Sequence, residues 1–230
     1  MTTFALVHGA WHGAWCWERL VPELVARGHT CIVMDLPIDD ASATFDDYAD
    51  VVVDACTDAS SDLVVVGHSL GGMVVPLVAA RRAVALGVFL CGVVPNLQGM
   101  PWDDAPPMGD DDYGNERDAD GTMHFTALEA ATAIFYADCT PADAAWAFAR
   151  LRPVRNASLW DRPYPLSEWP SSRFAAITCT EDRAIHAGFQ RHCVRERLGV
   201  VPVELPGHHS PFLADPARLA STLDALGSCG

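Results

Sequence analysis

Short runs of apolar residues alternate along the chain with longer stretches in which apolar residues recur every three or four positions. The short runs predict buried strands, and the longer stretches predict amphipathic helices. The N-terminal half contains four strand-like runs, at residues 4–8, 31–34, 63–66 and 85–91. Helical spacing fills the intervals between and after them, at residues 15–27, 45–59 and 70–82. Strands that alternate with helices predict a parallel sheet with right-handed crossovers.

A long segment of different composition interrupts this alternation. Residues 99–121 contain eight Asp or Glu among prolines and glycines, which predicts a mobile surface loop that cannot be buried as sheet or core helix. Helical spacing and strand-like runs then return, at residues 125–137, 140–152, 174–178, 185–198 and 201–205, with a last helix from residue 215. We therefore expect an α/β fold with a mostly parallel sheet of about six strands and helices on both faces. Its core would comprise residues 1–94 and 171–230, with a helical lid or cap inserted at residues 95–170.

The strongest chemical signal is the sequence Gly-His-Ser-Leu-Gly-Gly, which directly follows the third apolar run. Gly67 and Gly71 flank Ser69 at the two positions where a Cβ would collide with neighbouring backbone, as a nucleophile elbow requires. A glycine-rich strand-to-helix turn without chemistry is the alternative interpretation. Pro76 predicts a kink near Gly72 in the helix that follows, because proline removes a helical hydrogen bond.

Charge and composition narrow the classes of partner. The net charge is −15 and the chain has only 15 Lys and Arg, which disfavours nucleic acid and anionic membranes as partners. The longest apolar run, residues 83–94, is too short to cross a bilayer, and no secretory signal is visible, so we expect a cytoplasmic protein. The eight cysteines form no CxxC pair, and several fall in strand-like runs, so we expect reduced thiols. A small-molecule substrate is the expected partner, and a homodimer is left open.

Candidate partners for the serine follow two later strands. A serine hydroxyl needs a base, and that base needs an orienting carboxylate. Functional side chains of parallel sheets collect beyond the carboxyl ends of the strands. Glu181 and Asp182 follow one such end, and His208 and His209 follow the next. The chain order Ser, Asp, His is typical of sheets with a nucleophile elbow, but it leaves the choice within each pair open.

The other histidines share no metal-ligand spacing with a cysteine or carboxylate cluster. We therefore interpret them as structural or solvent-exposed residues, and we expect no metal and no cofactor. They are His8, His12, His29, His68, His124, His186 and His192.

Four stretches of the chain, FALVHGAWHGAW, GHSLGGM, TCTEDRAIHAGFQRH and HSPFLADP, together resemble the α/β-hydrolase superfamily. Within it they are most similar to the plant-type branch of small-ester esterases and hydroxynitrile lyases. The resemblance covers both ends of the chain well and the insertion poorly. It implies Ser69 as nucleophile, Asp182 as orienting acid and His209 as base, because the branch shows a similar apolar stretch and acidic-proline pair after its base. His208 and Glu181 are the competing choices.

An oxyanion that forms on an attacked carbonyl needs fixed backbone donors. The elbow provides the N–H of Leu70, and the loop after the first strand provides the second donor. The first of two HGAW copies lies directly at that strand end, so we expect the donor to be the N–H of Ala10, with Gly9 allowing the turn. Several aromatic residues could make an apolar substrate pocket, although packing between cap and core is the alternative. They are Trp11, Trp15, Phe135, Tyr136 and Trp146.

The favoured function is a serine hydrolase that cleaves a small apolar carboxylic ester, such as a methyl or aryl ester or a lactone, through an acyl-enzyme. The alternatives are a hydroxynitrile lyase and a non-catalytic small-ligand-binding protein on a hydrolase scaffold. Lyases of the similar branch have a threonine where Gly9 stands and a lysine directly after the base, where this chain has Ser210. Both departures favour the esterase. Some hormone receptors of the superfamily keep the triad, so an intact set of residues argues only weakly against the binding protein.

Overall fold

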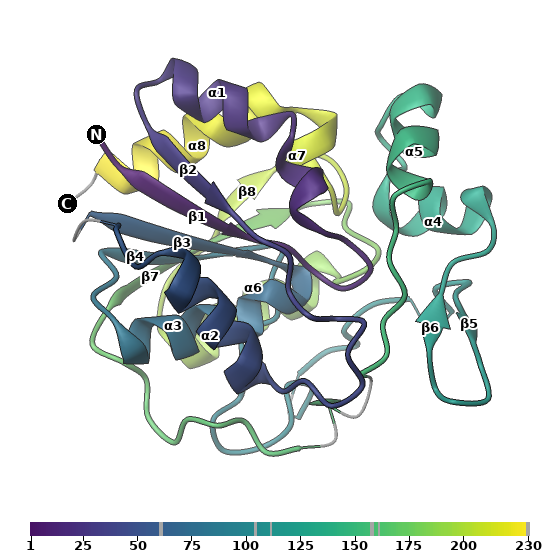
Figure 1. Ribbon diagram of the computed structural model, residues 1–230, viewed down its shortest axis with the longest axis horizontal. Coiled ribbons are helices and arrows are strands. Elements are labelled where there is room, and N and C mark those ends of the chain that lie inside the picture. The colour runs from purple at the N-terminus through teal and green to yellow at the C-terminus, as the bar shows by residue number, and fades with distance from the viewer. Residues whose placement is uncertain (60–61, 104, 111, 157–158, 161, 229–230) are drawn as a thin grey trace.

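The computed structural model describes residues 1–230 except 60–61, 104, 111, 157–158, 161 and 229–230. A six-stranded sheet, all of it parallel, runs through the molecule in the order β2-β1-β3-β4-β7-β8 (Figure 1). Its strands are β1 (Thr3–Val7), β2 (Thr30–Val33), β3 (Leu63–His68), β4 (Leu86–Leu90), β7 (Arg173–Cys179) and β8 (Val203–Leu205). Strand number, direction and alternation with helices confirm the α/β fold expected from the sequence.

Position in the sheet explains which strands the sequence marks most clearly. Every residue of β3 and β4 is buried, because these strands are covered on both faces, and both read as continuous apolar runs. The edge strands β2 and β8 are largely exposed or half-buried. Their apolar runs are correspondingly shorter, and β8 begins two residues later than expected.

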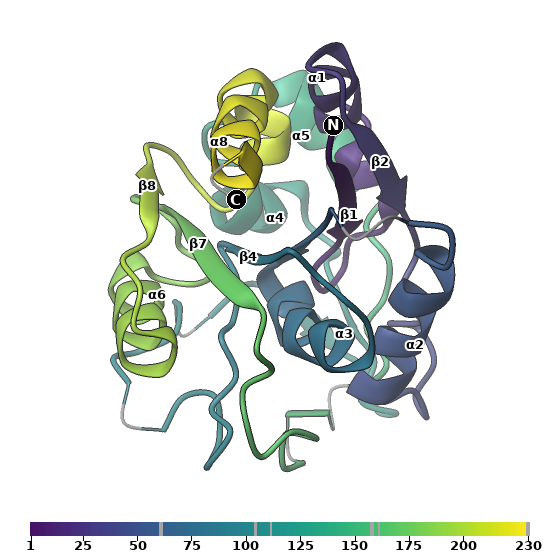
Figure 2. The same cartoon turned by 90° about the vertical axis from the view of Figure 1, so that its left-hand side faces the viewer.

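Helices cover both faces of the sheet. They are α1 (Leu20–Ala26), α2 (Phe45–Ala55), α3 (Val75–Arg81), α6 (Ala187–Cys193), α7 (Pro211–Ala214) and α8 (Pro216–Ser228). Helices α1 and α8 pack together on one face, whereas α2, α3 and α6 lie on the other (Figures 1 and 2). Helix α2 starts where Thr44 and Asp47 form a capping box, in which each side chain accepts a hydrogen bond from the other residue's backbone N–H.

Three predicted helices are divided in the structure. The helix predicted at residues 15–27 consists of a 3-10 turn, η1 (Ala14–Trp17), followed by α1. The helix predicted at residues 185–198 consists of α6 followed by a π-helical turn, η4 (Val194–Leu198). The helix after the elbow begins as a 3-10 turn, η2 (Ser69–Met73), and changes to α3 across Val74. The kink expected near Gly72 is therefore a change of helix type. Pro76 lies in the first turn of α3, where its missing N–H costs little.

The insertion lies between β4 and β7, and its helices and short strands form a group at the right of Figure 1. Its elements are β5 (Glu116–Arg117), β6 (Met123–His124), α4 (Leu128–Phe135) and α5 (Pro141–Phe148). Within residues 99–121, which were expected to form a surface loop that is not buried as sheet or core helix, β5 pairs with β6 in antiparallel fashion. Both residues of β5 are exposed, so the acidic composition excluded burial of this segment but did not exclude strand pairing. Within the described ranges, no helix has both the length and the apolarity needed to cross a membrane.

Candidate active site

Ser69 lies at the junction of β3 and η2 in a left-handed backbone conformation, with φ of 53°. A Cβ on Gly67 would lie 2.3 Å from the carbonyl oxygen of Gly71, and a Cβ on Gly71 would lie 2.7 Å from the carbonyl oxygen of Val7. No side chain fits at either position, so the two glycines allow β1, β3 and the turn to approach closely. Strain of this kind at a residue other than glycine is concentrated at functional sites.

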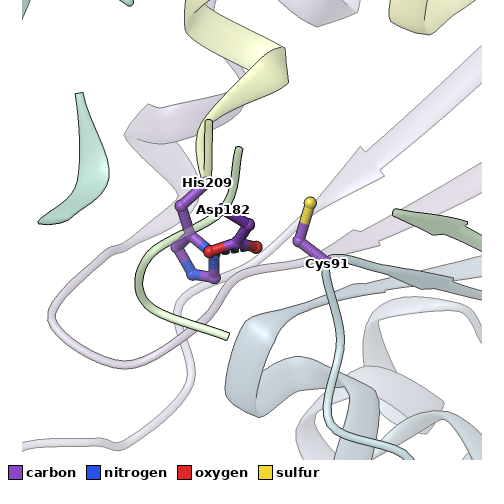
Figure 3. Close-up of side chains that lie close together, drawn as sticks. All are labelled: Cys91, Asp182 and His209. Carbon is purple, nitrogen blue, oxygen red and sulfur yellow. Dashed lines mark hydrogen bonds and ion pairs between the residues drawn. The ribbon is translucent and has the colours of Figure 1, made fainter. Parts of the chain in front are cut away.

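Asp182 follows β7 and His209 follows β8, and their side chains form a buried acid–base pair. The Nδ1 of His209 donates a hydrogen bond of 2.8 Å to Oδ2 of Asp182, and both side chains are almost completely buried (Figure 3). Asp182 also accepts hydrogen bonds of 2.9 Å from the backbone N–H of Ile185 and from Nε2 of Gln190. These three donors compensate the burial of a carboxylate.

His68 connects this pair to the elbow. Its Nε2 donates a 2.9 Å hydrogen bond to the carbonyl oxygen of His209, and the centroids of the two rings are 4.5 Å apart. Burial lowers the pKa of His68 well below its ordinary value, so this ring is neutral. Because His68 directly precedes Ser69, this contact fixes the backbone of His209 against the elbow.

The competing residues form a looser and more exposed pair. Nε2 of His208 lies 3.6 Å from Oε2 of Glu181, and the Glu181 side chain is 63% exposed. The backbone N–H of His208 donates to Asp138 at 2.9 Å. The structure therefore brings together Asp182 with His209, and separately Glu181 with His208.

Cys91 is the third side chain of this buried cluster. One ligand atom from each of Cys91, Asp182 and His209 lies within 4.8 Å of the other two (Figure 3). Burial raises the pKa of the Cys91 thiol well above its ordinary value, which disfavours the thiolate that a metal would need. The Nδ1 of His209 is already engaged with Asp182. These contacts describe a hydrogen-bonded acid–base pair better than a set of metal ligands.

A cavity of about 110 Å³ lies beside the elbow. Five residues singled out from the sequence line it, namely Ala10, Trp11, Ser69, Leu70 and Phe135. Sequence reasoning missed the rest of the wall. The additional lining residues are Val93, Met108, Tyr113, Met123, Val154, Asn156, Leu159, Trp160, Ala184 and Ile185.

Three of the five aromatic residues expected to line a pocket, Trp15, Tyr136 and Trp146, are not part of this wall, and neither is Gly9. Tyr136 is completely buried, and its hydroxyl is bonded to His12. Trp146 packs edge-to-face against Trp15, with 5.4 Å between ring centroids. For these two aromatic residues, the structure shows packing between the insertion and the core.

The loop after β1 passes directly against the elbow. A Cβ on Gly9 would lie 2.7 Å from the Cβ of Ser69, so only glycine fits here without movement. Ala10 and Leu70, the two expected oxyanion donors, both border the cavity that contains Ser69. Their backbone segments therefore lie on the same cavity as the serine.

Trp11 forms part of the cavity wall and is only 8% exposed. Its ring contacts Phe125 and Phe135, at centroid distances of 5.4 Å and 5.7 Å. Its backbone φ is 60°, a left-handed conformation that bulky residues rarely adopt. We therefore expect this indole to narrow the cavity beside Ser69.

Comparison with known proteins places this chain in a family. The model of the Alpha/beta hydrolase family matches residues 4–222. The chain belongs to the alpha/beta hydrolase family. This hydrolase is 29% identical to norfluorocurarine synthase 2 from Strychnos sp over 252 residues, which cover 96% of this chain and 93% of that protein.

Two further comparisons are with proteins named as esterases. Esterase PIR7B from Oryza sativa subsp. japonica is 39% identical over 104 residues, which cover 40% of this hydrolase and 39% of that protein. The crystal structure of polyneuridine aldehyde esterase superposes with a TM-score of 0.81 at 23% identity, covering 99% of this chain and 100% of that one. The structural match shows a shared fold, as the sequence resemblance implied.

Proposed function

We propose that this hydrolase cleaves a small apolar carboxylic ester through an acyl-enzyme, with Ser69 as nucleophile, His209 as base and Asp182 as orienting acid. The observation that supports this most strongly is the buried 2.8 Å bond between His209 and Asp182, with His209 also bonded to His68, the residue before the strained and glycine-flanked Ser69. The partial match to a protein named as an esterase agrees with this chemistry.

In this mechanism, the Ser69 hydroxyl attacks the ester carbonyl while Nε2 of His209 takes its proton. Asp182 holds the Nδ1–H side of the ring and stabilises the imidazolium that forms. The imidazolium then gives its proton to the departing alcohol, and the acyl-enzyme is hydrolysed by water in the same way. The N–H groups of Ala10 and Leu70 stabilise the oxyanion, and the loss of one such donor typically costs about 3 to 4 kcal/mol.

Cavity size and chemistry support a small apolar acyl or aryl group. An engineered apolar cavity of about 150 Å³ binds benzene, and the cavity here is about 110 Å³. Its polar side chains are engaged elsewhere, since Tyr113 donates to the carbonyl of Ala184 and Asn156 donates to the hydroxyl of Tyr48. The wall therefore offers few free groups to a charged substrate.

The inserted residues 95–170 are the proposed cap, placed between core residues 1–94 and 171–230. Most of the cavity wall that sequence reasoning missed comes from this insertion, which supports a role in substrate selection. A cytoplasmic location and a homodimer stay predictions. Fractionation of the source cells and sedimentation of the purified chain test them.

The geometry at Gly9 favours the esterase over the lyase. A threonine at this position would place its Cβ 2.7 Å from the Cβ of Ser69. The residue after the base, Ser210, is completely buried and neutral, so it offers no ammonium group for a cyanide ion. Cleavage of mandelonitrile at a rate comparable with ester hydrolysis would favour the lyase instead.

The test uses Ser69→Ala and a matched control, Ser221→Ala, on the exposed side of α8. We expect Ser69→Ala to lower kcat for p-nitrophenyl acetate by about 10⁴-fold or more, and Ser221→Ala to leave it unchanged. A fluorophosphonate should label Ser69 in the wild-type chain, as peptide mass spectrometry would show. Absence of labelling, or wild-type turnover in Ser69→Ala, would contradict the proposal, and ester binding without turnover would indicate the ligand-binding alternative.

A further inference from the structure

Two buried histidines of the repeated HGAW sequence lie outside the proposed triad, and each contacts the loop after β1. Nδ1 of His8 donates a 2.8 Å hydrogen bond to the carbonyl oxygen of Gly9. Its Nε2 accepts a 2.9 Å hydrogen bond from the backbone N–H of Leu36. A carbonyl oxygen only accepts and a backbone N–H only donates, so this ring is neutral with its proton on Nδ1. Burial lowers the pKa of His8 to about 4, in agreement with that state.

His12 makes the same kind of contact one peptide later. Its Nδ1 donates a 2.8 Å hydrogen bond to the carbonyl oxygen of Ala10, and its Nε2 lies 2.9 Å from the hydroxyl of Tyr136. Because Nδ1 must carry the proton, a neutral ring leaves Nε2 to accept from the tyrosine. Burial lowers the pKa of His12 to about 3, so the ring is neutral near pH 7. Tyr136 directly follows α4, so this contact joins the insertion to the loop.

These two contacts fix both peptide planes that flank the Cα of Ala10. The C=O and N–H of a trans peptide lie in one plane and point in opposite directions, and no described peptide is cis. The carbonyl of Gly9 shares its plane with the N–H of Ala10, so His8 sets the direction of the proposed oxyanion donor. His12 sets the following plane, which carries the carbonyl of Ala10 and the N–H of Trp11.

The next residue shows why this second plane needs support. Trp11 has a φ of 60°, a left-handed conformation that is strained at a bulky residue. The N–H of Arg152 holds the carbonyl of Trp11 at 2.7 Å, so the loop is fixed on both sides of the strained residue. Without the bond from His12, the peptide between Ala10 and Trp11 could rotate and relieve that strain.

We propose that His12 is a positioning residue of the oxyanion loop, and that Tyr136 holds it in the tautomer that this role requires. The inference rests on the proposed ester hydrolysis for its effect on rate, but its effect on the loop is independent of that function. The second hydrogen bond of the His8 ring comes from Leu36 of the core, whereas that of the His12 ring comes from Tyr136 of the insertion. The insertion therefore shapes the oxyanion loop as well as the cavity wall.

The experiment compares His12→Leu, His12→Asn and Tyr136→Phe with the wild-type chain. Leucine removes the donor to Ala10, whereas the amide nitrogen of asparagine occupies the position of Nδ1 and can still donate. For p-nitrophenyl acetate we expect His12→Leu to lower kcat by about 10²-fold with little change in KM, because the loop that carries the Ala10 N–H is misplaced while the N–H itself is kept. His12→Asn should recover kcat to within tenfold of wild type, and Tyr136→Phe should fall between these two.

Two further readouts separate positioning from a merely structural role. The inhibition constant of butylboronic acid, whose tetrahedral adduct mimics the oxyanion, should rise in His12→Leu by the same factor by which kcat falls. Active sites are counted by phosphonate titration, so a smaller folded fraction cannot imitate this result. Amide hydrogen exchange of a peptide covering residues 9–13 should become faster in His12→Leu and should stay near wild type in His12→Asn.

The proposal is wrong if His12→Leu keeps kcat and boronic acid affinity within threefold of wild type, or if exchange of residues 9–13 is unchanged. Failure of the proposed function would be seen differently, as absence of turnover and of Ser69 labelling in the wild-type chain. In that case the exchange measurement still decides whether His12 fixes the loop.

Discussion

Replacement of Gly9 by alanine adds one methyl group where the loop after β1 passes the elbow. The new Cβ would lie 2.7 Å from the Cβ of Ser69 and 3.1 Å from both Nδ1 and the carbonyl oxygen of His68. Carbon atoms in contact are about 3.5–4.0 Å apart, so the loop or the elbow must move by about 1 Å. Both Ser69 and His68 are held in place by the sheet and by His209, so we expect the loop that carries Ala10 to move.

A misplacement of about 1 Å at a catalytic group costs about 10²-fold in rate. We therefore expect Gly9→Ala to lower kcat/KM for p-nitrophenyl acetate by about 10²-fold, or about 2.7 kcal/mol of transition-state stabilisation. Overpacking should also lower the free energy of unfolding by about 1–3 kcal/mol. Each kcal/mol lost should lower Tm by about 2–4 °C. Steady-state kinetics and thermal unfolding measure the two effects.

Gly188→Ala is the matched control for this substitution. Gly188 lies in α6, and a Cβ there would meet no atom within 4 Å. Its kcat/KM should equal that of the wild-type chain, and its stability should be equal or higher, because alanine favours helix. If Gly9→Ala matches this control in kcat/KM to within threefold, the close contact between loop and elbow does not have the catalytic importance inferred here.

Three other predictions follow from the described contacts. Burial lowers the pKa of His8 to about 4 and that of His12 to about 3, so below pH 6.5 the unfolded chain binds protons that the folded chain does not. The free energy of unfolding should therefore fall by about 1.4 kcal/mol per pH unit for each ring between pH 6.5 and about pH 4, with a smaller slope in His12→Asn. Urea unfolding at a series of pH values measures these slopes, and equal slopes in the wild-type chain and in His12→Asn would refute the prediction. Asp182→Asn should lower kcat by about 10⁴-fold while Glu181→Gln changes it less than threefold, and the reverse order in steady-state kinetics would exchange the two roles. Trp11→Ala should raise the ratio of kcat/KM for an ester with a bulky acyl group to kcat/KM for p-nitrophenyl acetate by about tenfold. An unchanged ratio in a substrate panel would show that this indole does not limit the size of the pocket.

The elbow could be predicted from the sequence because its requirements are local. Gly67 and Gly71 are needed by the backbone around Ser69 itself, and the apolar run before them identifies the strand. The pairing of Asp182 with His209 was also predictable, because parallel topology brings the ends of neighbouring strands together. The choice of these residues over their neighbours came from the family resemblance.

The cavity wall could not be predicted, because long-range contacts determine it. Met108 and Tyr113 lie in the acidic segment that composition assigned to an exposed loop. The segment reaches the cavity because Asp110 pairs with Arg183 and His186, each at 2.7 Å, and these contacts join residues more than seventy positions apart. The isolated apolar residues in an otherwise acidic loop were the available signal.

Aromatic residues of the insertion show a second limit. Phe135 and Trp146 lie on consecutive helices with similar apolar spacing, yet one borders the cavity and the other packs on Trp15. Spacing identifies the buried face of each helix, but it does not show which neighbour that face meets. Helix type was missed for the same reason, since 3-10 and α-helical turns have similar apolar spacing over a few residues.

The insertion leaves the core after β4 and returns to β7, and these two strands are direct neighbours in the sheet. One continuous stretch of gene therefore encodes most of the substrate-facing wall, and its length can change during evolution without altering the register of any core strand. The bonds from Tyr136 to His12 and from Arg152 to Trp11 limit this freedom. An insertion grafted from another protein would have to reproduce both hydrogen bonds. A change of insertion would therefore change catalytic rate together with substrate selectivity.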